Sequence, residues 1–348
     1  MTDQFTEHIR DSQPAAASEQ GERRLGSSSG GISPDDLDRG LARLDPLTVR
    51  PRVSSTVLCL ILAAVFAGIG FGAWWLGVRT VDGQSYEDMV WSNFSRSIPG
   101  WLSPFVDVFA FSGRVIAVCV VIGVVSLAIA LARRRWWTVG QLAVFAALCF
   151  GAEQLKKVLP RPFLINTESM TANSAPSGHT ILAAAAGMAL IIVVPRAARA
   201  LASLVAAALT LLVGLSVISH QWHRPSDVVM SVALVGAIGL VMIAATRTSG
   251  MDAPGSRMSS ASVQIVASVL ITLGVMVCLY AAYIIWQIEP GLVFKAQWAR
   301  SGANASTVAM IVGIDALVFG TVLALRQLTA APLSKIGLVG APPAPPSK

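Results

Sequence analysis

The stretch PSGHTILAAAAGMALIIVVPR, residues 176–196, decides the fold class of this chain. After a few polar residues it stays apolar until the proline and arginine that close it. A helix of about 20 apolar residues matches the hydrocarbon thickness of a bilayer. The stretch therefore predicts a membrane-spanning helix with polar residues at one membrane face and arginine at the other.

The same apolar pattern recurs along the chain. Only 13% of its 348 residues are charged, against about 25% in a typical soluble domain. We expect spans at residues 53–78, 103–132, 138–158, 178–195, 201–220, 227–246, 261–287 and 305–326. The sequence thus predicts an all-α polytopic membrane bundle of about eight transmembrane helices.

The spans divide the chain into five parts. Residues 1–50 are polar and predict a disordered cytoplasmic tail, and the proline-rich residues 328–348 predict a second one. Between them we expect two N-terminal spans in 51–139, a four-helix core in 140–247 and two C-terminal spans in 248–327. The first apolar run begins too late and is too long for a secretory signal, so we expect a retained helix.

Basic residues gather in the loops on one side of the predicted membrane. They include Arg133–Arg135, Arg196, Arg199, Arg247 and the two tails. The positive-inside rule makes this side cytoplasmic, together with both termini. The loops around 79–102, 159–177, 220–226 and 288–304 are then extracytoplasmic. This distribution also accounts for the net charge of +7, and because no nucleic-acid module is visible we expect no nucleic-acid partner.

Cations follow the third predicted span, in Lys156-Lys157-Val158-Leu159-Pro160-Arg161-Pro162. Cations at a helix end can simply snorkel to the membrane surface. Arg161, however, lies between two prolines in an extended stretch, where a guanidinium can grip phosphate oxygens with two parallel hydrogen bonds. Both interpretations of these cations remain open.

The fourth predicted span begins with Ser177, Gly178 and His179. A helix start presents unsatisfied N–H groups and partial positive charge, which together favour an anion. Ser177 fits an N-cap, and Gly178 lets the backbone approach a ligand closely. The alternative is an ordinary serine-capped helix with an interfacial histidine.

The fifth and sixth predicted spans are joined through His223-Arg224-Pro225-Ser226-Asp227. A carboxylate four residues beyond His223 can accept its ring N–H and leave the other ring nitrogen nucleophilic. Asp227 can equally be a helix cap. His220 precedes this motif, and we expect it to support the site or to lie at the interface.

These motifs together resemble the type 2 phosphatidic acid phosphatase and vanadium haloperoxidase superfamily, in its integral-membrane lipid phosphatase branch. The resemblance covers residues from about 140 to 247. It implies a helical core whose phosphate pocket opens at the extracytoplasmic surface. It implies no metal and no cofactor. Eight spans argue against the soluble acid phosphatases and haloperoxidases of the superfamily.

By this resemblance His223 attacks phosphorus to form a phosphohistidine, Asp227 orients it, and His179 protonates the leaving group. The resemblance also assigns phosphate binding to Lys156, Arg161 and the backbone amides of Ser177 and Gly178.

Two departures from the family pattern affect this assignment. In the family motif, a lysine stands seven residues before the arginine, and the matching position before Arg161 holds Gln154 in this chain. Lys156 stands five residues before Arg161. A loop two residues shorter would bring it to the family position, which favours Lys156 over Lys157. The third family motif begins Ser-Arg, whereas Ser216 is followed by Val217, so one phosphate-binding arginine is missing.

Two arginines are candidates to replace it. Arg224 follows His223 directly, and its direction is open. Arg114 is expected inside the span 103–132, on the same helix face as Asp107. Charges inside a membrane are costly and usually functional, although a structural ion pair between these two residues is the alternative.

The sequence thus predicts dephosphorylation of a polyprenyl or glycerolipid phosphate or diphosphate in a bacterial plasma membrane, at the extracytoplasmic face. The alternative is a catalytically weak protein that binds or transports a phosphorylated lipid. The substrate lipid and the oligomeric state stay open.

Overall fold

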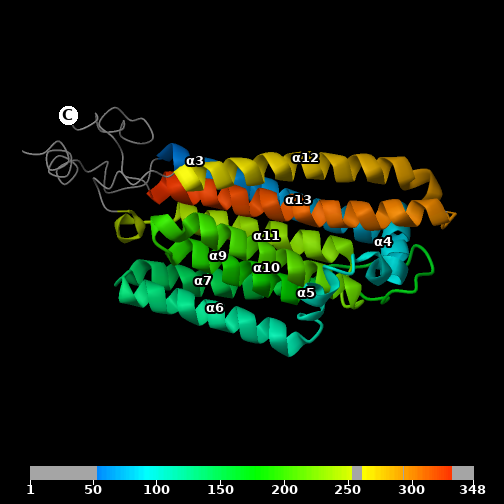
Figure 1. The fold of residues 1–348 in the computed structure, drawn as a ribbon, viewed down its shortest axis with the longest axis horizontal. Coiled ribbons are helices and arrows are strands. Elements are labelled where there is room, and N and C mark those ends of the chain that lie inside the picture. The colour runs from blue at the N-terminus through cyan, green and yellow to red at the C-terminus, as the bar shows by residue number, and fades with distance from the viewer. Residues whose placement is uncertain (1–52, 253–260, 293, 331–348) are drawn as a thin grey trace, which may run out of the picture.

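The computed structural model describes residues 53–252, 261–292 and 294–330, and this part of the chain is helical without strands (Figure 1). The predicted tails fall almost wholly outside these residues. The long helices are α3 (Val53–Arg79), α6 (Ser112–Ala132), α7 (Trp136–Glu153), α9 (Gly178–Val193), α10 (Arg199–Ser219), α11 (Pro225–Ala244), α12 (Ala261–Leu292) and α13 (Gln297–Ala330). They run side by side along one axis.

Seven of the helical segments are long and apolar enough to cross a membrane. The eighth apolar helix, α9, has 16 residues and is shorter than the others. The prediction of an all-α membrane bundle is confirmed, and each of the eight predicted spans overlaps one of these long helices. α13 extends the last span to Ala330.

The centre of the bundle is α11, which is buried along almost its whole length. It packs against α3, α9 and α13, and small residues allow close approach at several contacts. For example, α11 meets α9 where Gly239 lies against the Met188 side chain. The core segment that carries the motifs is therefore surrounded by the N- and C-terminal helices.

The predicted span 103–132 is two helices, α5 (Ser103–Asp107) and α6, separated by an extended residue at Phe111. Phe111 is the N-cap of α6 and makes no side-chain cap hydrogen bond. Arg114 therefore lies in the first turn of α6 and is exposed, with its guanidinium 4.7 Å from the Phe111 ring centre and donating to Val108 O. Arg114 thus lies at the start of the span Ser112–Ala132 and not in the interior of one continuous helix over 103–132.

The predicted loop 79–102 contains the helices α4 (Val81–Asn93) and η2 (Phe94–Ser97). Thr80 caps α4 by accepting a hydrogen bond from Gly83 N at 3.0 Å. Gln84 on α4 donates to Val78 O and to Pro162 O, each at 2.8 Å, and Asp88 accepts from Glu168 N at 2.6 Å. α4 thus anchors the long loop 159–177 to the end of the bundle.

The two ends of the bundle differ in character. At one end, here called the motif end, α3 finishes, α4 lies across, and α9 and α11 begin. The opposite end holds an arginine cluster of Arg133, Arg135, Arg199 and Arg326 around Asp252. Arg199 binds the Asp252 carboxylate with two hydrogen bonds of 2.8 and 2.7 Å.

Candidate active site

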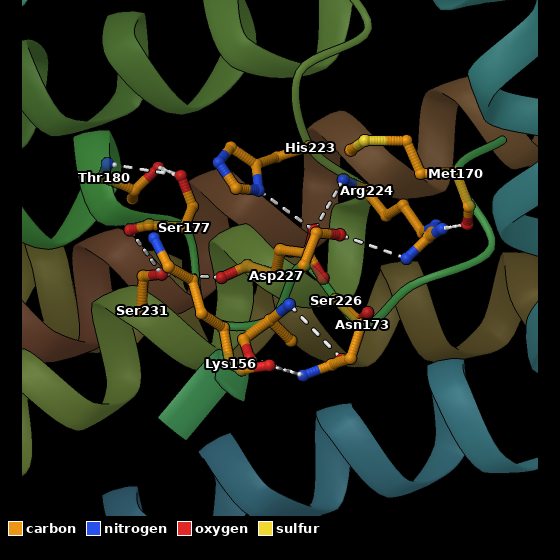
Figure 2. A network of polar contacts seen from close by, with 12 residues as sticks. Lys156, Met170, Asn173, Ser177, Thr180, His223, Arg224, Ser226, Asp227 and Ser231 are labelled. Atoms are coloured by element: carbon orange, nitrogen blue, oxygen red, sulfur yellow. Dashed lines mark hydrogen bonds and ion pairs between the residues drawn. The ribbon is translucent and has the colours of Figure 1, made fainter. Parts of the chain in front are cut away.

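The start of α11 holds a histidine–carboxylate pair at the motif end. Nδ1 of His223 lies 3.1 Å from Oδ2 of Asp227, and the carboxylate is fully buried (Figure 2). The same oxygen accepts from Ser174 Oγ at 2.5 Å and from Arg224 N at 3.0 Å. A carboxylate can only accept, so Nδ1 carries the proton and Nε2 keeps its lone pair. His223 is therefore oriented as a nucleophile or base.

The start of α9 lies directly beside this pair. Ser177 Oγ caps the helix by accepting from Thr180 N at 3.4 Å, and Ser177 N donates to Asp227 O at 3.3 Å. The Ser177 amide is thus already used within the protein. The first-turn amides that remain for an anion are those of Gly178 and His179. Ser177 serves chiefly to join the two helix starts.

His179 is held in place from α6. Its Nε2 lies 2.7 Å from Ser112 Oγ, and its ring centre lies 5.1 Å from that of Trp222. His223, Lys156 and Glu153 are all within electrostatic range of His179. His220, in contrast, turns toward Asp107, with Nε2 and Oδ1 3.6 Å apart. The structure thus brings His179 and His223 to one place and leaves His220 at its margin.

Of the two adjacent lysines, Lys156 faces the site. Its Nζ lies 2.5 Å from Glu153 Oε1, and a methyl group added at Gly178 would lie 3.0 Å from that same oxygen. Gly178 therefore leaves room for the Glu153 carboxylate, and Lys156 stands beside the start of α9. Lys157 is exposed.

Arg161 offers an unused donor at the same site. Its side chain is 4% exposed, and Nη1 lies 3.4 Å from Glu87 Oε2. Nη2 is buried and has no hydrogen-bond partner among the described residues. Burial, followed by the neighbouring Arg224, lowers the pKa of Arg161. A buried N–H of a cation without an acceptor is costly, so this geometry favours an anionic ligand.

Arg224 points away from His223 in Figure 2 and is fully buried. Its guanidinium donates to Ser174 Oγ at 3.0 Å, to Ser169 Oγ at 3.3 Å and to Met170 O. Arg224 therefore fastens loop 159–177 over the start of α11. It is not directed to the side where Nε2 of His223 lies.

Val217 occupies the position of the missing family arginine, and it is buried in the helix core. Its carbonyl accepts from Trp222 N at 2.8 Å and from His223 N at 3.1 Å, which shapes the turn that carries His223. Arg224 is turned to the loop, and Arg114 is exposed at the start of α6.

Glu87 of α4 is a site residue that the sequence patterns did not reveal. It is 1% exposed, its Oε2 lies 3.4 Å from Arg161 and 4.0 Å from Arg224, and its Oε1 accepts from Ser226 Oγ. Burial, reinforced by the charge of Asp227, raises the pKa of Glu87 to about 7. The only sequence signal was a group of three acids, Asp82, Glu87 and Asp88, between two apolar spans.

Among the described residues, no group of three or more histidine, cysteine, aspartate or glutamate side chains could hold a metal ion. The candidate site consists of two histidines, cations at the ends of helices, and two carboxylates. Asp227 pairs with His223 and Glu87 with Arg161.

Residues 142–251 match the model of the PAP2 superfamily. No curated protein and no solved structure matches the chain. The matched residues contain Lys156, Arg161, His179, His223 and Asp227. Their bounds agree with residues 140–247, the segment in which the sequence motifs resemble that family. Residues 142–251, which carry these five residues, are therefore a PAP2 superfamily segment of the chain.

Proposed function

We propose that this protein is a metal-independent phosphatase that hydrolyses a lipid phosphate or diphosphate. PAP2 superfamily membership supports phosphatase chemistry in general. The observation that carries the proposal is the convergence of the His223–Asp227 pair with His179, Lys156 and Nη2 of Arg161, which has no partner among the described residues. Such a ring of donors around an oriented nucleophile stabilises the charge of a phosphoryl-transfer transition state.

In the proposed reaction, Nε2 of His223 forms a bond to phosphorus while the bond from phosphorus to the lipid oxygen breaks. His179 gives its proton to that oxygen, and the lipid alcohol or phosphate leaves. Water then attacks the phosphohistidine, His179 takes one proton from this water, and the phosphorus–nitrogen bond breaks. Asp227 holds the Nδ1 proton and stabilises the positive charge on the ring.

We propose that the motif end faces the outside of the plasma membrane. The support is the positive-inside rule, because Arg133–Arg135, Arg196 and Arg199 lie at the opposite end. A site at the end of a membrane bundle suits a substrate whose phosphate is at the surface and whose chain is in the bilayer. Polyprenyl and glycerolipid phosphates both meet this description.

Phosphate release by the purified protein tests the proposal. We would offer a panel of polyprenyl and glycerolipid phosphates in the presence of a chelator, and compare wild type with His223→Ala and His220→Ala. We expect release by wild type and His220→Ala and none by His223→Ala. The enzyme proposal fails if wild type releases no phosphate from any lipid of the panel.

A second candidate function is binding or transport of a phosphorylated lipid with weak catalysis. The observation in its favour is Val217, buried where the family has a phosphate-binding arginine. Lipid phosphate binding to wild type without phosphate release supports this candidate. A binding role does not require an acid and a nucleophile together, so the paired histidines favour the phosphatase.

A further inference from the structure

A cavity of about 370 Å³ lies behind the candidate active site at the motif end. Its walls come from α3, α4, α11, α12 and α13. His179, His223 and Lys156 are not among the described residues that line it. The cavity is therefore separate from the place where phosphate would react.

Glu87 forms the partition between the two places. Its Oε2 faces Arg161 and Arg224 on the phosphate side, while its Oε1 accepts from Ser226 Oγ. A methyl group added at Gly77, which lines the cavity, would lie 2.8 Å from Glu87 Oε1. One carboxylate oxygen thus belongs to the phosphate site and the other to the cavity side.

The charge of the cavity is one-sided. Asp82 and Glu87 from α4 and Glu289 from α12 line it, and its described lining residues include no lysine, arginine or histidine. The rest of the wall is mainly apolar, with Leu76, Ile285 and Met310 among its side chains. A ligand that fits both properties has an apolar chain and a cationic head.

We propose that this cavity binds an amphiphile with an amine head, with its ammonium group among Asp82, Glu87 and Glu289 and its chain against the apolar wall. The bilayer can supply such a molecule, because Leu76 on α3 is 65% exposed at the edge of the bundle. An anionic head would be repelled by the carboxylates. Glu87 already faces Arg161 and Arg224, so the charge of an ammonium head would be matched chiefly by the exposed carboxylates of Asp82 and Glu289.

Photo-labelling tests this proposal without relying on catalysis. The full-length protein in phosphatidylcholine nanodiscs would receive a diazirine-bearing octadecylamine or the matching octadecanol, at pH 8. The amine is protonated at this pH. We expect the amine to label peptides containing Leu76, Ile285 or Met310 about fivefold more than the alcohol. One partly exposed ion pair favours binding by about this ratio. Labelling of lipid-facing α6 should be equal for the two probes.

Variants locate the effect. Asp82→Asn with Glu289→Gln should lower amine labelling toward that of the alcohol, whereas Glu168→Gln, which removes an exposed carboxylate outside the cavity, should not. The His223→Ala variant should be labelled like wild type, because labelling does not require catalysis. The cavity proposal can therefore hold even if the phosphatase proposal fails. Equal labelling of the cavity peptides by amine and alcohol in wild type overturns the proposal.

Discussion

The Glu87 carboxylate of α4 lies 3.4 Å from the Arg161 guanidinium, and both side chains are buried. Glu87 stands outside residues 142–251, whereas Arg161 stands inside them. A segment before the PAP2 part of the chain therefore contributes a charged group to the candidate site. This carboxylate partly neutralises a cation on which the proposed phosphate binding depends, so the two anions would compete for Arg161.

Activity should therefore depend on the ionisation of Glu87. Its pKa is raised to about 7, so it is neutral below that pH and releases Arg161 for phosphate. We expect KM for a lipid phosphate to rise as pH increases through 7 in wild type. In the Glu87→Gln variant this rise in KM should be absent. KM should then change with pH only as far as the substrate itself titrates. Steady-state kinetics from pH 5.5 to about 8.5 would measure both, a range that brackets this pKa.

The same residue should affect stability, with a definite sign. Because the pKa of Glu87 is raised from 4.5 in the folded protein, the folded state holds its proton more tightly than the unfolded state. Stability should fall as pH rises from about 4.5 to 7 and then level off with respect to this group. Thermal unfolding of Glu87→Gln should lack that part of the decline. An identical pH dependence in both proteins contradicts the assignment.

Replacing Asp227 by asparagine should disable catalysis while leaving the fold intact. The amide cannot hold the Nδ1 proton of His223 as the carboxylate does, and we expect kcat to drop about 10³–10⁴-fold. The matched control is Asp107→Asn, since Asp107 is an exposed carboxylate that faces His220. The rate of phosphate release would be measured for both variants and compared. Unfolding curves would verify that both are folded. Similar losses in the two variants would argue against the special role of Asp227.

The eight apolar helices could be predicted because the bilayer thickness sets the length of a spanning helix. A run of apolar residues of that length is visible in the sequence. His223 and Asp227 could be found because they are four residues apart at one helix start, and His179 because it follows Pro-Ser-Gly at another. Glu87 could not, because its partners Arg161, Arg224 and Ser226 are brought to it only by tertiary packing. Arg114 was misplaced for a similar reason, because apolar composition continues through residues 108–111 and hides the break before α6.

The two lysines of the first motif should behave differently. Lys156 lies beside Glu153 and the start of α9, whereas Lys157 is exposed. We expect Lys156→Gln to lower kcat/KM by about 10²-fold, as loss of one donor to a charged transition state does. Lys157→Gln should stay within about twofold, as for a solvated charge. The reverse order would assign the phosphate contact to Lys157.

Restoring the family arginine at position 217 should harm the protein. Val217 is fully buried and its surroundings are packed, so Val217→Arg buries an unpaired charge and adds volume. We expect a loss of at least about 3 kcal/mol in the free energy of unfolding and no gain in activity. Val217→Met is the control, because it adds length without charge. A Val217→Arg protein that folds normally and hydrolyses faster would show that the side chain reaches the phosphate.

The arginine cluster at the opposite end should depend on its single described acid. Asp252 accepts two hydrogen bonds from Arg199, and the buried Arg326 and Arg135 donate to backbone carbonyls of Gly250 and Met251 close by. Asp252→Asn leaves these charges to repel one another without a counter-ion, and we expect a loss of about 3–5 kcal/mol in the free energy of unfolding.

A double-mutant cycle with Arg199→Gln would separate this pairing from other effects of the substitution. Removing both partners should cost less than the sum of the two single losses, because the second change also removes a charge that the first left unpaired. Unfolding in mixed micelles provides the four stabilities. Strict additivity would mean that the neighbouring carbonyls at the end of α9, to which Arg133 and Arg326 donate, already neutralise the cluster.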